Sequence, residues 1–169
     1  MTAYHTEDVI RDGVTYRIEH HYDTYTGAPW ENCDGRGKVT RVERDWYTGR
    51  INKKPGQVVL CAGGRNEYSY LYDFQDAMEQ AKRDGWNTKP YDAPNRALRA
   101  VQADMEFLRG WCADDWHYMG VVVFPLTEDG DELRSQSVSL WGIESCSDDR
   151  IIEVQNELVS EITLEIQGV

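Results

Sequence analysis

The longest apolar stretch of this chain, Met119-Gly-Val-Val-Val-Phe-Pro-Leu126, limits what the chain can fold into. A helix that crosses a membrane needs about 20 apolar residues, and no stretch of the sequence approaches that length. Residues 116–124 are apolar on both faces of an extended segment, as in a strand at the centre of a sheet. The sequence therefore predicts a buried central strand, and the remaining segments must supply its neighbours and its cover.

Other segments with strand character occur before and after this stretch. Residues 14–22 alternate between apolar and polar side chains, and an acidic turn at 127–132 lets the chain return beside the central strand. The segments 57–61 and 67–72 flank two glycines, which predicts a hairpin. The predicted strands are 14–22, 38–46, 57–61, 67–72, 116–124 and 137–145.

Three amphipathic helices are predicted in addition to the strands. The first follows Asp73, a residue type that caps helix N-termini, and ends before Gly85. The second begins near Pro94, and the third begins after Ser147. The predicted buried stripe of the third helix is Ile151, Val154, Leu158, Ile162 and Ile166. Groups of strands interrupted by helices predict an α+β fold, with a mainly antiparallel sheet and about three helices packed on it, in a single domain of residues 1–169.

The acidic residues are distributed unevenly along the chain. Residues 1–102 contain 15 Asp/Glu and 15 Lys/Arg, whereas residues 103–169 contain 15 Asp/Glu and only three arginines. The formal net charge of −12 therefore lies entirely in this acidic part, residues 103–169. Such a concentration creates a strongly negative field, which favours a partner with a basic surface over a small-molecule reaction.

The predicted last helix carries a row of glutamates at a spacing of four residues. Each step rises about 6 Å and turns about 40° around the helix, so the carboxylates form one slowly winding row. Like charges at this spacing repel, and solubility alone does not require them. We interpret the row as a partner-binding face that imitates a nucleic-acid backbone, a DNA mimic; the alternative is an ordinary solvated face. The predicted binding residues are Asp148, Asp149, Glu153, Glu157, Glu161 and Glu165.

A basic segment, residues 36–54, supports a different hypothesis. It combines arginines and lysines with aromatic residues, a pattern that can bind phosphates and stack on bases. The net charge of the whole protein opposes nucleic acid, so a nucleic-acid-binding module is the alternative function, beside a solvated hairpin whose Trp packs on the core. The candidate nucleic-acid-binding residues are Arg41, Arg44, Trp46, Tyr47 and Arg50.

A second alternative is a small enzyme or metal site around Cys112-Ala-Asp-Asp-Trp-His117. A thiol, the carboxylates of Asp114 and Asp115 and an imidazole lie there within six residues. No familiar catalytic or cofactor motif is present, and no zinc-ligand pair, so we expect no catalytic residue, metal or cofactor. The four cysteines lie 28, 51 and 34 residues apart, unlike those of small secreted disulfide proteins, and we expect reduced thiols.

Five stretches support a resemblance: Pro29-Trp-Glu-Asn-Cys-Asp-Gly-Arg-Gly37, Tyr72-Asp-Phe-Gln-Asp-Ala77, Lys82-Arg-Asp-Gly-Trp86, Trp111-Cys-Ala-Asp-Asp-Trp116 and Leu140-Trp-Gly-Ile-Glu144. Through them the chain resembles small uncharacterised acidic proteins encoded by bacteriophages and prophages. The resemblance implies no established activity, but it implies a phage accessory protein in the bacterial cytoplasm, and the first eight residues lack the features of a signal peptide. Because small acidic phage proteins often inhibit host defence proteins, we expect a non-enzymatic inhibitor that occupies the basic surface of a host protein.

The separation of charge also predicts self-association. A neutral first part with a basic segment, followed by a part of charge −12, makes a large dipole that a second copy can partly neutralise. The last helix also carries Ile152, Val159 and Leu164 outside its main apolar stripe. We therefore expect a homodimer, with the last helix or the basic segment at or near the contact.

Overall fold

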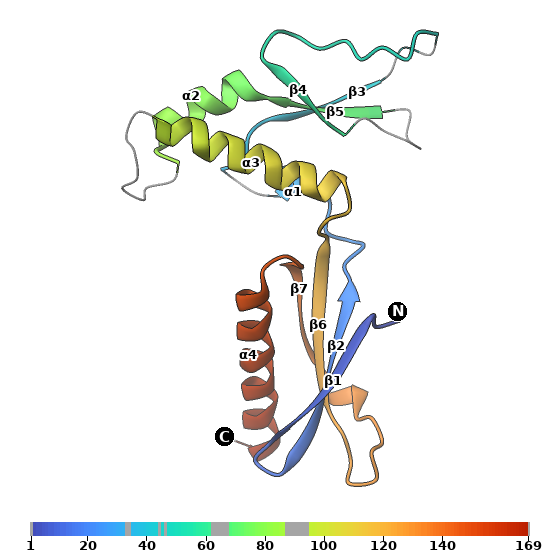
Figure 1. Cartoon of the computed structure of the whole chain (residues 1–169). Coiled ribbons are helices and arrows are strands. Elements are labelled where there is room, and N and C mark those ends of the chain that lie inside the picture. The colour runs from blue at the N-terminus through green and yellow to red at the C-terminus, as the bar shows by residue number, and fades with distance from the viewer. Residues whose placement is uncertain are drawn as a thin grey trace. The chain divides into compact units, whose positions relative to one another are not determined.

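The computed structural model describes residues 2–32, 35–43, 45, 47–61, 68–86 and 95–168. The chain divides into two compact units: a terminal unit, Met1–Thr26 with Trp116–Val169, and an inserted unit, Gly27–Asp115 (Figure 1). The sequence analysis expected a single domain, because no stretch of linker-like composition marks where one unit is inserted into the other. The described residues form seven strands in antiparallel sheets and three helices longer than one or two turns, a mixed α+β fold as predicted.

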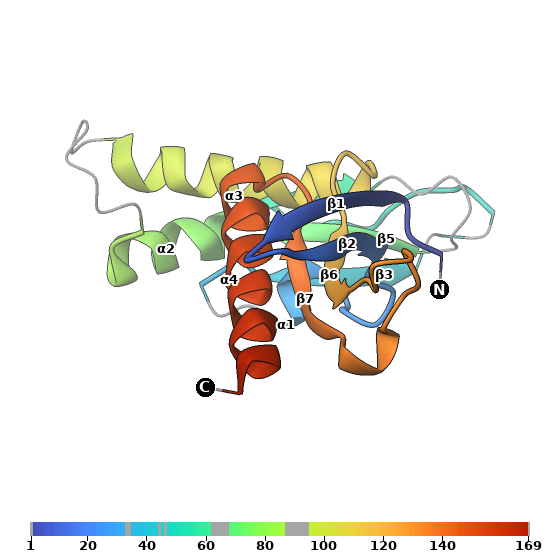
Figure 2. The same cartoon turned by 90° about the horizontal axis from the view of Figure 1, so that it is seen from below.

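The terminal unit is a four-stranded antiparallel sheet with one long helix along one face (Figures 1 and 2). Its strands lie in the order β1-β2-β6-β7, and the predicted central strand is β6, between β2 and β7. The three strands predicted in this unit are confirmed, with boundaries that differ by at most two residues. The elements are β1 (His5–Arg11), β2 (Val14–Tyr22), β6 (Tyr118–Pro125), β7 (Val138–Glu144) and α4 (Asp148–Gln167).

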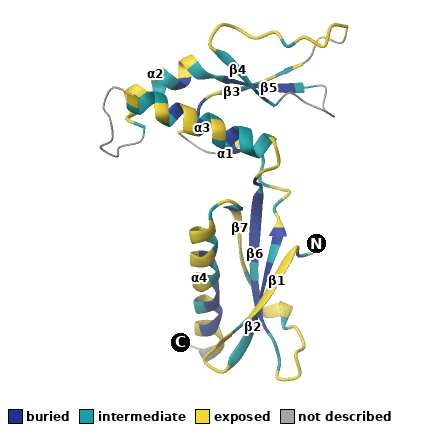
Figure 3. Ribbon diagram, in the orientation of Figure 1, coloured by how far each residue is buried: buried dark blue, intermediate teal, exposed yellow. Residues whose placement is uncertain are grey.

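Strand β1 was not predicted from the sequence. It pairs with β2 through a tight turn at Asp12 and Gly13, whose φ angles of 51° and 81° suit a two-residue hairpin loop. The strand lies at the edge of the sheet and is mostly exposed, whereas β6 is mostly buried (Figure 3). An exposed edge strand needs no apolar alternation, so its sequence carries little strand signal.

The core of the terminal unit lies between the sheet and α4. Its buried side chains are Tyr16, Ile18, Met119, Val121, Val123, Ile143, Val154, Leu158, Val159 and Ile162. Two predictions for α4 were wrong: Ile166 is exposed, and Val159 is buried. The buried side of α4 is wider than the predicted stripe. Thr163, one helical turn after Val159, is also buried, and its hydroxyl is hydrogen bonded to the hydroxyl of Tyr16 (3.0 Å).

The opposite face of this sheet is covered in part by side chains of β7 and of the connection between β6 and β7. Trp141 packs directly on Gly120, where a Cβ atom would lie 2.2 Å from the indole ring. The connection contains a short 3₁₀ helix, η2 (Arg134–Gln136), and the guanidinium of Arg134 lies 4.4 Å from the ring centre of Phe124. Both faces of β6 are therefore covered, as its apolar sequence requires.

The inserted unit is a three-stranded antiparallel sheet with helices on it. The order β3-β5-β4 confirms that the segments 57–61 and 67–72 pair, although the turn between them lies outside the described residues. Asp73 caps α2 as predicted, accepting a hydrogen bond from the backbone N–H of Asp76 (3.1 Å). The predicted start of the next helix, Pro94, also lies outside the described residues. The elements are α1 (Pro29–Asn32), β3 (Val39–Glu43), β4 (Gln57–Cys61), β5 (Tyr68–Asp73), α2 (Phe74–Asp84) and α3 (Arg96–Cys112).

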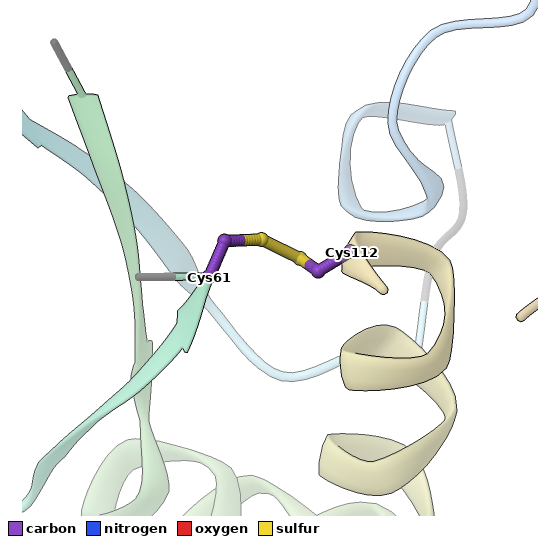
Figure 4. Close-up of a disulfide and its surroundings, with 2 residues drawn as sticks. All are labelled: Cys61 and Cys112. Carbon is purple, nitrogen blue, oxygen red and sulfur yellow. A yellow bond between two sulfur atoms is a disulfide. The ribbon is translucent and has the colours of Figure 1, made fainter. Parts of the chain in front are cut away.

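A disulfide joins two elements of the inserted unit. Cys61, at the end of β4, is bonded to Cys112, the last residue of α3, across 51 residues of sequence (Figure 4). The prediction that these two cysteines are reduced thiols was wrong. Spacing along the chain did not indicate the bond, because strand pairing and helix packing bring the two Cα atoms to 5.6 Å. Cys146, in the terminal unit, is exposed.

Candidate functional site

The net charge of the protein coincides with one structural unit. The terminal unit contains 16 Asp/Glu and four Lys/Arg, a net charge of −12, and the inserted unit contains 14 of each, a net charge of zero. The sequence alone placed the acidic part at residues 103–169. In the structure the acidic unit consists of residues 1–26 and 116–169, because the start of the chain folds with its acidic end. One compact body therefore carries the whole negative field.

The six predicted binding acids all lie on α4, and all six are exposed. Arg150 forms ion pairs with Glu153 (2.6 Å) and Glu157 (3.6 Å), so it neutralises part of the row near the start of the helix. In the described part of the chain, Glu161 and Glu165 form no ion pair with Lys or Arg, and the last turn of α4 contains no basic residue. The half of α4 near its C-terminus is thus the less neutralised half of the row.

A row on one helix carries about half the charge density of a DNA strand. Another acid of the same unit, Glu132, does not add a free charge to the row. Its carboxylate accepts hydrogen bonds from Arg17 (2.9 Å) and Arg134 (2.7 Å). The exposed row is therefore a strip of charge along α4, and the DNA-mimic hypothesis remains a prediction.

Arg17, Glu132 and Arg134 belong to a chain of charges on the sheet face opposite α4. Glu19, only 6% exposed, accepts hydrogen bonds from Arg134 (2.7 and 3.2 Å) and is hydrogen bonded to Nε2 of the buried His21 (3.0 Å). Burial raises the pKa of Glu19, but hydrogen bonds from Arg134 and His21 lower it more, so its pKa lies below the ordinary value. This network attaches the β6–β7 connection to β2, and sequence reasoning missed it because Glu19 and Arg134 are 115 residues apart.

A groove runs between the edge strand β1 and α4. It consists of two adjoining cavities, of about 490 and 600 Å³, and both are lined by Ile152 and Gln155. Glu7 and Val9 of β1 line the first cavity, and Tyr4 lines the second. This groove was missed because β1 was not predicted, although Asp12-Gly13 is a dipeptide typical of the two-residue hairpin loop that joins β1 to β2.

The middle of the groove is polar. The side-chain amide of Gln155 donates hydrogen bonds to Oε1 of Glu7 (2.7 Å) and to Nε2 of His20 (2.9 Å). The ring of His20 lies 4.8 Å from that of His5. Burial, followed by the nearby charge of His5, lowers the pKa of His20, which favours a neutral imidazole that accepts the hydrogen bond from Gln155.

The hypothesis of an enzyme around Cys112 and His117 is not supported by the bonding of these residues. Cys112 is held in the disulfide with Cys61, so its sulfur is not a free thiolate nucleophile. Cys112, Asp114 and Asp115 belong to the inserted unit, whereas His117 belongs to the terminal unit. His117 stacks near Tyr22, with ring centres 4.5 Å apart.

Of the predicted nucleic-acid-binding residues, Arg41 lies on β3, and Tyr47 and Arg50 lie in the segment after it. The guanidinium of Arg41 stacks on Tyr68, 3.5 Å from the ring centre, and Tyr47 is 95% exposed. Arg50 is exposed beside Tyr47, while Arg44 and Trp46 lie outside the described residues. Among the described residues of segment 36–54, β3 is the only strand, and it pairs with β5; the next strand in sequence, β4, pairs on the other side of β5.

Another basic residue of that segment is held in the core of the inserted unit. Arg36 forms an ion pair with the buried carboxylate of Asp104 (3.1 Å). The same carboxylate accepts hydrogen bonds from the backbone N–H of Gly37 (2.8 Å) and the hydroxyl of Tyr72 (2.9 Å). Arg36 therefore has a structural role. The positive charge available on this surface comes from the residues that follow it in the segment.

No helix within the described ranges is both long and apolar enough to span a membrane. Among the side chains that the structure describes, no group of three or more His, Cys, Asp or Glu is arranged to hold a metal ion. No protein-family model, curated protein or solved structure matches this chain.

Proposed function

We propose that the terminal unit is a non-enzymatic acidic binding module, which docks on the basic, nucleic-acid-binding surface of another protein and thereby blocks it. One observation carries the proposal: the entire net charge of −12 belongs to one compact unit, and the acids of α4 are exposed on its surface. A field of one sign attracts a partner of the opposite sign and accelerates their encounter.

The resemblance to small acidic phage proteins supplies the biological setting of the proposal. In that setting the protein acts in the cytoplasm of a bacterial host, as an anti-defence inhibitor, and its partner is a host protein that binds nucleic acid. Membranes and cofactors have no part in this function, and free nucleic acid is repelled by the charge of the terminal unit.

The test is capture of a partner from host lysate by the tagged full-length protein. Replacing Glu153, Glu157, Glu161 and Glu165 with Lys is expected to abolish capture, because it reverses the charge of the row. Capture by the wild-type protein is also expected to weaken steeply with salt, since exposed charges are screened over about 8–10 Å at physiological ionic strength. The captured protein must then lose its binding to nucleic acid when the wild-type protein is added.

A matched variant controls for net charge alone. Four exposed acids of the inserted unit, replaced with Lys, change the total charge by the same amount but leave α4 unchanged; they are Glu43, Glu79, Glu106 and Asp115. Circular dichroism of both variants must remain native. Capture that survives the α4 reversal, or that is lost equally in both variants, contradicts the proposal.

Nucleic-acid binding by the inserted unit is the second candidate function. The observations in its favour are the exposed aromatic ring of Tyr47 and the Arg41–Tyr68 stack, both in the inserted unit, since bases stack on such rings. Gel-shift assays with single- and double-stranded DNA and RNA test it. Submicromolar binding that is lost in Arg41→Glu would replace the first proposal by this one.

A homodimer is a further part of the proposal. The inserted unit presents the exposed cations Arg41 and Arg50, and a second copy presents the acids of α4. Light scattering at micromolar concentration measures the mass directly. A mass near 19.5 kDa contradicts a dimer, and a dimer that dissociates in molar salt indicates pairing between charges.

A further inference from the structure

Helix α4 leaves part of the sheet in the terminal unit uncovered. Strands lie about 4.8 Å apart, so four of them span about 14 Å between the outer two, whereas a helix is about 10 Å across. The buried side chains of α4 pack on β2, β6 and β7, which includes Tyr16, Val121 and Ile143. The fourth strand, β1, contributes only a partly buried Val9 to this core, and the rest of the strand is exposed.

The groove beside β1 is lined by apolar side chains that remain exposed. Ile152 is 55% exposed and Tyr4 is 42% exposed, and both line the cavities of the groove. Large apolar side chains gathered along one groove are typical of a surface that a partner covers. By comparison, Leu164 of α4 is also exposed (52%) but lines neither cavity.

The charge around the groove selects the kind of partner. Glu7 and Asp148 line the groove and are exposed, and the unit that contains them has a net charge of −12. Arg11, the one cation among the lining residues, donates a hydrogen bond to the hydroxyl of Ser160 (2.7 Å). A second terminal unit would bring another charge of −12 to this surface and be repelled, whereas a basic partner would be attracted.

We propose that the β1–α4 groove binds a basic amphipathic helix of the partner protein, which lies beside α4 and completes the helical layer over the sheet. Its apolar face contacts Tyr4 and Ile152, and its lysines and arginines face Glu7 and Asp148. This is the helix-in-groove mode of recognition, in which a row of apolar anchors supplies affinity and the flanking charges supply orientation. The inference rests on the proposed function, because it names the segment of the basic partner that the acidic unit holds.

Synthetic peptides of defined pattern test the groove by fluorescence anisotropy with the full-length protein. The probe is a helix of about 18 residues with leucines on one face and lysines and arginines on the other. The comparison peptides are a scrambled sequence of the same composition and a version with every cation replaced by Glu. We expect the amphipathic basic peptide to bind at least tenfold more tightly than either, because only it can use the apolar groove and the charge together.

Two matched substitutions locate the peptide on the protein. Ile152→Ser is expected to weaken binding about tenfold, the loss that follows from removing one buried aliphatic contact. Leu164→Ser removes an equally exposed apolar residue from the same helix and is expected to leave binding unchanged. Both positions are exposed, and circular dichroism checks that each variant keeps the wild-type fold.

The following outcomes contradict the inference. The groove is not the site if the scrambled peptide binds as tightly, or if Ile152→Ser and Leu164→Ser behave alike. It is also not the site if reversal of the α4 acids abolishes capture of a partner but Ile152→Ser does not weaken it. That result leaves the proposed function standing. A dimer that is lost in Ile152→Ser but kept in Leu164→Ser identifies a second copy as the occupant. If no peptide binds and no partner is captured from lysate, the proposed function is contradicted as well.

Discussion

Gly120 illustrates how one missing side chain shapes the terminal unit. The indole of Trp141 occupies the space in which a Cβ would lie, so the ring packs directly on the backbone of β6. It also lies near the buried His21, with ring centres 6.1 Å apart. A glycine in a central strand, which weakens a strand by itself, is thus required here by the close approach of an aromatic ring.

The first prediction at this scale is that Gly120→Ala destabilises the protein by about 1–3 kcal/mol, as overpacking of a close contact does. The cause is the collision with Trp141, so the penalty is expected to shrink when Trp141→Ala is added. Urea denaturation of the four proteins in this double-mutant cycle measures the coupling. Purely additive effects would mean that some other contact requires the glycine.

The second residue-level prediction concerns acid sensitivity. Since the pKa of Glu19 is lowered in the folded protein, the unfolded chain binds more protons below about pH 4.3, and the stabilisation by Glu19 is lost as the pH falls. Glu19→Gln is therefore expected to be much less stable than wild type at pH 7, and less different from it at pH 3. Denaturant titrations at several pH values measure the difference, with Glu128→Gln in the exposed turn as the control. A difference that is independent of pH would contradict the role of the ionised carboxylate.

At the scale of elements, the disulfide between β4 and α3 closes a loop of 51 residues in the inserted unit. In the chain-entropy model, a loop of this length restricts the unfolded state by about 4 kcal/mol. We predict that Cys61→Ser with Cys112→Ser, or reduction of the wild-type protein, lowers the stability of the inserted unit by a few kcal/mol and leaves the amide signals of α4 unchanged. Hydrogen exchange resolved by residue separates the two units. Equal loss of protection in both would contradict a stabilisation confined to the inserted unit.

The state of this bond inside a cell is a separate question with its own measurement. A reducing cytoplasm disfavours disulfides, so a protein that acts there is expected to contain some reduced Cys61 and Cys112. Alkylation of fresh lysate followed by mass spectrometry counts the blocked thiols. Complete protection of both cysteines would argue against the cytoplasmic setting of the proposed function.

At the scale of the whole molecule, the chain is an insertion of one folded unit into another. The two ends of the terminal unit that flank the insertion are close, since the backbone N–H of Asp23 donates a hydrogen bond to the carbonyl of Tyr118 (2.9 Å). We predict that residues 27–115 can be replaced by about six Gly/Ser residues without loss of the terminal fold, because a short flexible linker spans such a gap. The shortened chain is expected to keep the charge of −12 and to unfold cooperatively by circular dichroism. A chain that lacks cooperative unfolding would show that the terminal unit depends on the inserted one.

The sequence by itself determined the local features of this protein. Apolar runs, alternation and caps located β2, β6, β7, α2 and α4, and counting charges located the acid near the end of the chain. These features depend on residues a few positions apart, such as Asp73 and Asp76 at the start of α2, and such signals can be read directly from the chain.

Only the tertiary structure decided which of these pieces act together. The Cys61–Cys112 bond and the Glu19–Arg134 pair join residues that lie 51 and 115 positions apart in the sequence. The groove exists only because β1 pairs with β2 beside α4, and the charge belongs to one unit only because residues 116–169 return to fold with residues 1–26. Periodicity reports which face of an element is apolar, but the identity of the surface that covers it depends on contacts between residues distant in sequence.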